Sequence, residues 1–420
     1  MKFSWKKKAI GVAALAMMFG LSACGNGGGG DKANGKTELK FWTLSLQPTF
    51  TDYIQGIIDD YEEENPDIKI VWEDLPQDSI QDKLLTTTAG GNAPDVVNTW
   101  TDLTMSLAGK GALVDLNKEA TDEQKAVYNE ELFNSTKYKD GVYAFPWYTT
   151  PQVQMFNKSL YEKAGVSVPK TYEDIFDSAA TVKEKTGAYQ YIPNAFTQIL
   201  IMDGQKVLND DNTKAAFNNP DVVELLGKFK KAVDSGAMPK NGWESWEEMV
   251  KLYSVNQLAS VSTGTASLAR IKDEAEDVYN NSDVAPAIVG EADLVKTATQ
   301  NLVVPATGKH IKEAVDFAAY VTNAKNQLEF SKLAEILPSA KEAQESDYFT
   351  SDTESLQGRA RALAAEASTH ATDAILPIPN FLEVRAEIDN IPSAVMNGTS
   401  VDKALADAEK KVNSLLERNN

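Results

Sequence analysis

The strongest constraint on the fold is a regular alternation of strand-like and helix-like segments near the start of the chain. Strand, helix, strand, helix and strand are predicted in turn over residues 39–44, 52–65, 68–72, 79–89 and 94–97. The first of these helices is expected to bury one face, made of Tyr53, Ile57, Ile58 and Tyr61. Such an alternation predicts a parallel sheet with helices on both faces. Ligands of such sheets bind at the carboxyl ends of the strands, here the loops after Thr43 and Val97.

The rest of the chain is too long for a single hydrophobic core, so two lobes of roughly 150–200 residues are expected. Helix signals continue throughout it. Thr171 and Asp174 predict a capping box, and Asn219-Pro220 predicts another helix start. The last helix is expected to be capped by Ser400. It should bury one stripe, made of Val401, Leu405, Ala408, Val412 and Leu415.

The N-terminus has the composition of a secretory signal. A basic start, Lys2 and residues 6–8, precedes the apolar run 9–21, which is too short to span a membrane. Leu21-Ser22-Ala23-Cys24 resembles the lipobox of bacterial lipoproteins. We therefore expect residues 1–23 to be removed as a signal peptide and Cys24 to carry a lipid. An ordinary cleaved signal that happens to contain a cysteine is the alternative.

Residues 24–37 are predicted to form a flexible, Gly-rich tether. Within it, GDKANGKT (residues 30–37) satisfies the phosphate-loop pattern. A working phosphate loop lies between a strand and a helix, whereas here glycines precede the motif and the strand-like run ELKFWTL follows it. The match therefore does not indicate a nucleotide site.

The low cysteine and histidine content excludes much catalytic and metal chemistry. Cys24 is the single cysteine, which leaves no disulfide and no thiolate zinc cluster. His310 and His370 lack convergent partners for a metal site or a triad, so each is expected at the surface or at a helix end. The net charge of −20 disfavours nucleic acid and anionic lipid as partners. We expect no cofactor and no metal.

Six segments in characteristic order and spacing carry a resemblance to a known family. They are FWT, DYEEENPDIKI, LLTTTAGGNAPDVVNTW, KGALVDL, GVYAFPWYTTPQVQMFNKSLYEKAGVSVPKTYEDIFDSA and NGTSVDKALADAEKKVNSLL. Together they span nearly the whole mature chain. They resemble extracellular family 1 of the solute-binding proteins of ABC importers, whose best-known members bind maltose and other oligosaccharides.

The resemblance implies a two-lobed α/β fold of the type II periplasmic-binding-protein kind. Each lobe would be a mainly parallel sheet flanked by helices, with the ligand in a cleft between the lobes. The first lobe would comprise residues 38–147 plus 297–337, and the second residues 148–296 plus 338–420. Closure on a carbohydrate would present a surface to the permease subunits of an ABC transporter. The implied protein is a monomeric receptor, lipid-anchored on the extracytoplasmic face of the cell membrane.

A sugar site needs aromatic rings for the apolar sugar faces and planar polar groups for the hydroxyls. In the first lobe, Trp100 and Asp102 follow the family-like PDVV strand, although Trp100 could instead pack beneath its own loop. At the crossing between the lobes, Trp147 and Tyr148 are expected on the cleft floor. Ser45 and Gln47, at the exit of the first strand, could donate hydrogen bonds. These six are the first-lobe and crossing candidates.

In the second lobe, the resemblance points to Asn194 and Phe196, with a core position as the alternative for Phe196. Trp243 is a further candidate, while burial is expected for Trp246. Gly264 is retained from a family segment whose usual aromatic is replaced here by Ala266. Arg270 could reach the cleft or cap its helix. The segment PIPNFLEVR resembles the family's last cleft segment and adds four candidates, Asn380, Phe381, Glu383 and Arg385.

Two other functions remain open from the sequence alone. A membrane-anchored glycoside hydrolase would use the same acidic and aromatic residues, and it would need a pair of cleft carboxyl groups at catalytic spacing. The same receptor fold could also bind a phosphoester, which a basic cluster would favour, or a polyamine, which an acidic aromatic cage without arginine would favour. The interpretation as a receptor predicts that the protein is not an enzyme.

Overall fold

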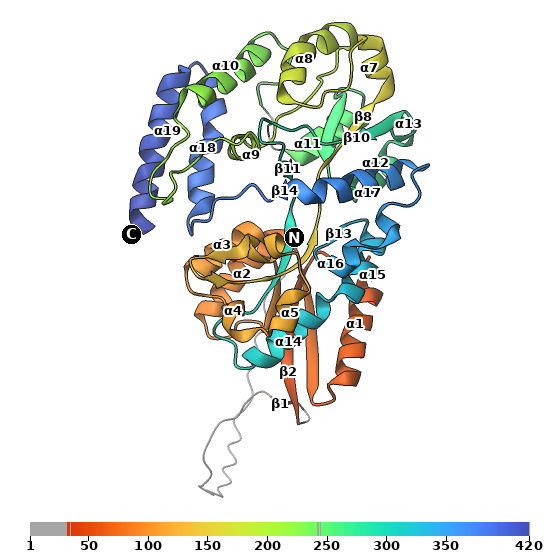
Figure 1. Cartoon of the computed structure of the whole chain (residues 1–420), viewed down its shortest axis with the longest axis vertical. Helices are drawn as coiled ribbons and strands as arrows, with labels where there is room; N and C mark the ends of the chain where they lie inside the picture. Colours follow the sequence, from red (N-terminus) through yellow and green to blue (C-terminus); the bar gives the residue numbers. More distant parts are fainter. Residues whose placement is uncertain (1–31, 34, 242, 244, 420) are drawn as a thin grey trace, which may run out of the picture.

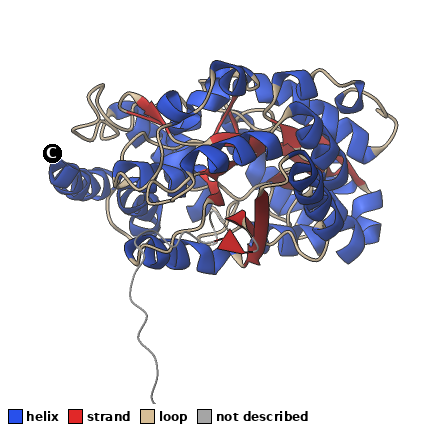
Figure 2. Cartoon of the chain, turned by 90° about the horizontal axis from the view of Figure 1, so that it is seen from below, coloured by secondary structure: helices blue, strands red, loops and turns tan. Residues whose placement is uncertain are grey.

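The computed structural model describes residues 32–33, 35–241, 243 and 245–419. Its strands form two main sheets, one in each of two lobes that lie one above the other in Figure 1. Helices surround the strands when the molecule is seen from below (Figure 2). The expected signal peptide, the lipidated Cys24 and most of the expected tether lie outside the described residues.

The first lobe contains a seven-stranded sheet in the order β1-β2-β4-β12-β7-β13, with β3 paired to β2. Its strands are β1 Lys32–Ala33, β2 Lys36–Leu44, β3 Ile68–Leu75, β4 Val96–Trp100, β7 Phe145–Thr149, β12 Thr299–Val303 and β13 Leu337–Pro338. The predicted parallel arrangement holds for β2, β3 and β4, whereas β12 runs antiparallel to both β4 and β7. A separate two-stranded antiparallel ribbon is formed by β5 Lys137–Tyr138 and β6 Gly141–Val142, which directly precede β7 in the sequence.

The first lobe contains α1 Thr51–Glu64 and α2 Gln77–Ala89 where the apolar spacing predicts them, together with helices that the sequence analysis did not predict. The others are α3 Thr101–Gly109, α4 Leu116–Glu119, α5 Asp122–Ala126, α6 Glu130–Phe133, α14 Ile311–Val321, α15 Ala324–Ala334 and α16 Lys341–Gln344. Helix α1 buries Ile57, Ile58 and Tyr61 as expected, together with Ile54. Tyr53 is only half-buried and stacks on Phe330.

The sheet of the second lobe corrects an expectation. Its strands, β8 Val153–Asn157, β9 Ser260–Thr263 and β10 Ser282–Ala285, pair antiparallel throughout, in the order β10-β8-β9. A mainly parallel sheet was expected here. The chain enters this lobe along β8 and returns toward the first lobe after β10, so these two neighbouring strands run in opposite directions.

Helices make up most of the second lobe. They are α7 Lys158–Ala164, α8 Tyr172–Thr186, α9 Phe196–Met202, α10 Pro220–Asp234, α11 Trp246–Ser254, α12 Ser267–Glu274, α13 Glu276–Asn280, α17 Leu356–Ala367, α18 Phe381–Met396 and α19 Val401–Leu416. The capping box of Thr171 and Asp174 is present, and the Asn219 side chain accepts a hydrogen bond from the Val222 N–H. Ser400 precedes α19 but makes no capping bond.

Three chain segments pass between the lobes. The first runs from Thr149, the last residue of β7, to Val153, the first of β8. The second joins β11 Val295–Lys296 to β12, and β11 pairs with β14 Ala371–Thr372. The third follows α16, which packs on α15 and β13. The expected lobe limits at Trp147 and Leu337 stay predictions; Trp147 lies within β7, and Leu337 begins β13.

Candidate functional site

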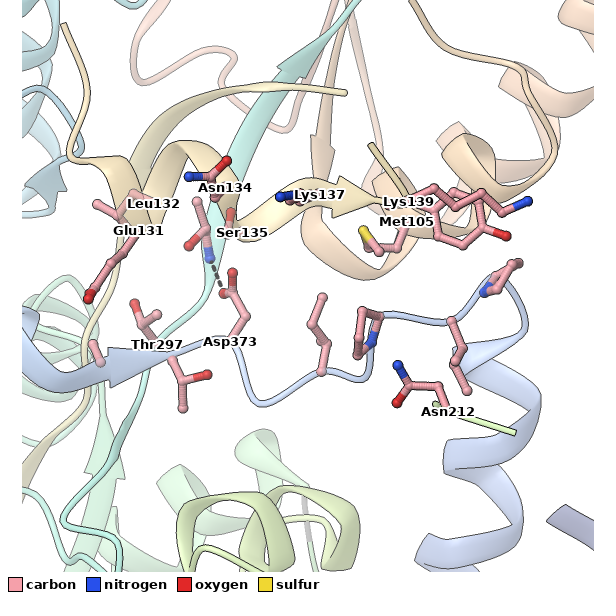
Figure 3. A pocket seen from close by; sticks show the side chains of 18 of the residues that line it. Met105, Glu131, Leu132, Asn134, Ser135, Lys137, Lys139, Asn212, Thr297 and Asp373 are labelled. Atoms are coloured by element: carbon pink, nitrogen blue, oxygen red, sulfur yellow. Dashed lines mark hydrogen bonds between the residues drawn. The ribbon is translucent and has the colours of Figure 1, made fainter. Parts of the chain in front are cut away.

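A polar groove with a volume of about 830 Å³ lies between the lobes. Figure 3 shows Asn134, Ser135 and Lys137 of the first lobe on one side and Asp373 and Asn212 of the second lobe on the other. None of the residues expected to bind ligand lines this groove. Some of the expected residues lie instead on α3, α9 and α18, and the others are spread over both lobes.

Asp373 ties the second lobe to the sheet of the first. Its carboxylate accepts hydrogen bonds from the backbone N–H of Thr299 (2.7 Å) and from the hydroxyl of Thr101 (2.8 Å). Thr299 begins β12 and Thr101 begins α3, so one side chain fixes two first-lobe elements. Burial raises the pKa of Asp373, and burial lowers the pKa of the neighbouring Lys296.

Helices α3 and α18 meet across the lobe boundary through a charged pair. Arg385 Nη1 lies 3.5 Å from Asp102 Oδ2, and both side chains are mostly buried, at 20% and 17% exposure. Burial raises the pKa of Asp102 to about 6, although the nearby guanidinium of Arg385 acts in the opposite direction. Close packing continues at the other end of α3, where a methyl group added to Gly109 would collide with Pro379.

Asp389 extends this charged pair into the second lobe. It lies one turn beyond Arg385 on α18, and its Oδ2 accepts a hydrogen bond from Arg385 Nε at 3.0 Å. Its other oxygen accepts two bonds, at 2.8 Å each, from the backbone N–H and the hydroxyl of Thr197 in the first turn of α9. A continuous polar chain therefore runs from α9 through α18 to α3.

A small hollow of about 190 Å³ adjoins Asp389 in the second lobe. Its lining includes Phe196, Trp243 and Lys240 together with Pro392. Trp243 is half-buried and donates its indole N–H to the Pro239 carbonyl at 3.2 Å. The hollow therefore places the half-buried ring of Trp243 beside charged groups, while Phe196 packs in the core behind it, and an accessible ring beside charged groups suits sugar binding.

Several expected residues lie near this charged chain. Asn194 and Phe196 immediately precede Thr197, and both are buried, with 6% and 1% exposure. Phe381 opens α18 but points into the core of the second lobe, with 2% exposure. Glu383 is exposed on the same helix, and Asn380 donates its side-chain N–H to the Leu415 carbonyl at 3.1 Å.

Trp147 requires a correction, because it is not a ring on the cleft floor. Its side chain has 0% exposure and stacks on Phe330 with 5.3 Å between ring centres. Tyr148 is half-buried and contacts both of these rings edge-on. Strand β7 lies between β12 and β13 and is covered by α14 and α15, so its aromatic side chains enter the first-lobe core.

Other expected residues make local contacts. Trp100 packs half-buried with the first-lobe cluster around Trp42, as the alternative interpretation of that residue allowed. Ser45 and Gln47 are exposed, and the Gln47 N–H donates to Asp74 at 2.9 Å. Gly264 lies beside Thr150 of the first crossing.

Arg270 neither caps its helix nor joins the charged chain. Its guanidinium pairs with Glu247 at 2.9 Å and with Glu274 at 2.7 Å, and it lies over the ring of Trp246. Trp246 is half-buried, and its indole N–H donates to Thr263 at 3.2 Å.

Sequence reasoning missed Lys296, Asp373 and Asp389. Asp373 and Lys296 lie far in sequence from Asp102 and Arg385, and no local pattern marks them. Asp389 carried a usable signal, since an acid four residues after an arginine on a predicted helix faces the same side. Among the described residues, no group of three or more His, Cys, Asp or Glu side chains is arranged to hold a metal ion.

Comparison with known proteins gives consistent results. The family described as bacterial extracellular solute-binding protein matches residues 47–328. The diacetylchitobiose binding protein DasA of Streptomyces coelicolor is 26% identical, and the match covers 97% of each chain. An uncharacterized lipoprotein of Streptomyces antibioticus is 24% identical over 80% of this chain and 77% of its own.

The fold also matches solved structures. The crystal structure of a putative oligosaccharide periplasmic-binding protein from a Synechococcus species superposes with a TM-score of 0.82 and 26% identity. The match covers 90% of this chain and 99% of that protein. The two-lobed arrangement is therefore shared by solved binding proteins of this kind.

Proposed function

We propose, since the chain belongs to the bacterial extracellular solute-binding protein family, that it is a receptor capturing a carbohydrate, most simply an oligosaccharide, for an ABC importer. The relatives are named as binding proteins, which supports a receptor and not an enzyme. Diacetylchitobiose and oligosaccharides are the ligands that the relatives' names state. We extend the ligand class, and not a particular sugar, to this chain.

The observation that carries the proposal is the charged contact between the lobes beside an aromatic hollow. Asp102 and Arg385 face each other from opposite lobes, and Phe196 and Trp243 line the hollow that adjoins Asp389. Carboxylates and guanidinium forks bind sugar hydroxyls, and aromatic rings pack on sugar faces. We propose that the ligand lies between α3, α9 and α18.

The charges at this place also weigh against the other ligand classes. Arg385 and Lys296 would repel a polyamine, whereas Asp102, Asp373 and Asp389 would repel a phosphoester. A neutral ligand with many hydroxyl groups suits this mixture of donors and acceptors.

We further propose the site residues and the anchor. The proposed contacts are Trp100, Asp102, Asn194, Trp243 and Arg385, with Ser45 and Gln47 at the rim; Phe196 packs in the core behind them, as its alternative interpretation allowed. Cys24 would carry the lipid that holds a monomer at the extracytoplasmic face of the membrane, and the similarity to a Streptomyces lipoprotein supports this. Within the described ranges, no helix is long and apolar enough to cross a membrane.

Calorimetric titration with diacetylchitobiose, maltotriose and arabinotriose tests the proposal. We expect at least one of these sugars to bind saturably and to raise the melting temperature, because a ligand that binds only the native state stabilises it. The same mixtures, analysed by chromatography after incubation, should contain intact sugar. Shortened sugar products would show that the protein is a hydrolase and not a receptor. If none of the three sugars bound, the proposal of a carbohydrate ligand would lose its support.

A further inference from the structure

Asp389 stands at the centre of the polar chain that links three helices, yet it belongs to no feature that the sequence marked as a site. Its two oxygens serve different elements. Oδ1 accepts both bonds from Thr197 at the start of α9, and Oδ2 accepts the Nε–H of Arg385 on its own helix. The side chain is 18% exposed, so most of it is buried among these partners.

The bond to Arg385 constrains where the guanidinium points. A free arginine side chain samples many rotamers, and holding it in one costs conformational entropy. With Nε held by Asp389 at 3.0 Å, the far edge of the fork is directed across the lobe boundary, where Nη1 reaches Asp102 at 3.5 Å. Because the guanidinium is planar, fixing one edge also fixes the plane of the other.

The two hydrogen bonds from Thr197 to Asp389 also concern the neighbouring aromatic residue, Phe196. Phe196 is the residue before Thr197, and it lines the hollow that also contains Asp389. The backbone N–H and the hydroxyl of Thr197 are both satisfied by one oxygen at 2.8 Å, which sets α9 against α18. One carboxylate thus holds a charged group and an aromatic group in fixed relation.

We propose that Asp389 is a positioning residue for ligand capture, which acts by holding the Arg385 guanidinium in the orientation that spans the lobes. The inference rests on the proposed function. It assigns to Asp389 an effect on affinity that passes through Arg385 and not through a general loss of stability.

Replacement of Asp389 by asparagine separates its two roles. The Asn Oδ1 atom still accepts the two Thr197 bonds, whereas its NH₂ group cannot accept the Arg385 Nε–H. The probe is whichever of diacetylchitobiose, maltotriose and arabinotriose binds the unaltered protein most tightly, measured by calorimetry. We expect Asp389→Asn to weaken binding about tenfold, the effect of one charge-assisted hydrogen bond.

A double-mutant cycle then tests the route. In an Arg385→Gln background, Asp389→Asn should change affinity less than twofold, because the group that it positions is already gone. The matched control is Asp407→Asn, which removes an acid from an exposed i, i+4 pair with Lys403 on α19 and should leave affinity unchanged.

Each outcome decides one of the two proposals. Equal losses in both backgrounds would show that Asp389 acts on its own or through the fold, and the positioning role would be wrong. Unchanged affinity in Asp389→Asn would have the same consequence. If the unaltered protein bound none of the three sugars, the carbohydrate proposal would fall first, and the positioning role with it.

Discussion

Two regions near the boundary between the lobes have opposite chemistry. Strand β7, which leads into the first crossing, is aromatic and dry, with Trp147 fully buried against Phe330 in the first-lobe core. The contact between α3 and α18 is charged, with Asp102 and Arg385 partly exposed to solvent. A strand that stays in its sheet while lobes move can be packed like a core, whereas a contact that forms and breaks must tolerate water on both faces. We therefore expect β7 to stay fixed in its sheet and the contact between α3 and α18 to form and break as the lobes move.

Truncation of the aromatic region should have the largest effect. Trp147→Ala leaves a cavity in the first-lobe core, and we expect the free energy of unfolding to fall by about 3–5 kcal/mol in urea denaturation. Trp243→Ala, which truncates a half-buried ring, is the matched control and should cost clearly less. A loss below about 1 kcal/mol for Trp147→Ala would mean that the crossing is not packed as a core.

The charged region should respond to pH, while the aromatic region should not. The pKa of Asp102 is raised to about 6, so the folded protein holds a proton that the unfolded chain releases between about pH 4 and pH 6. Stability contributed by this group is therefore lost as pH rises through that window, with an upper slope of about 1.4 kcal/mol per pH unit.

Melting curves at several pH values measure this slope. The raised pKa of Asp373 acts in the same direction, whereas Lys296 has a lowered pKa and acts at more alkaline pH. Arg385 is the remaining charge that acts on Asp102, and it is itself bonded to Asp389. Asp102→Asn should reduce the slope relative to the unaltered protein. An unchanged slope would show that Asp102 does not titrate there.

Removal of a charge outside both regions should have the smallest effect. Arg270 pairs with Glu247 and Glu274 on the surface and contacts neither α3 nor α18. Exposed pairs contribute little to stability, so Arg270→Ala should leave the urea denaturation midpoint almost unchanged and change sugar affinity less than twofold. A tenfold loss of affinity in calorimetry would mean that the charged region also includes Arg270 on α12.

The sequence predicted most of the fold because its signals are local. The strand and helix alternation and the Thr171 capping box are each set by residues a few positions apart. Trp147 was misplaced because a strand buried on both faces loses the alternation that separates inward from outward side chains. The contact of Asp102 with Arg385 could be suspected only from the family resemblance, and Asp373 from no signal at all, since that contact exists only after the lobes fold together.

The position of β12 has a consequence for how the chain is made. This strand lies between β4 and β7 in the middle of the first-lobe sheet, yet it follows β8, β9 and β10 in sequence. A chain that emerges from its N-terminus must therefore wait, with the edges of β4 and β7 uncovered, until the three-stranded sheet of the second lobe has appeared. The sheet that is made first therefore stays incomplete until the chain returns from the second lobe, and its open edges could pair with other strands until then.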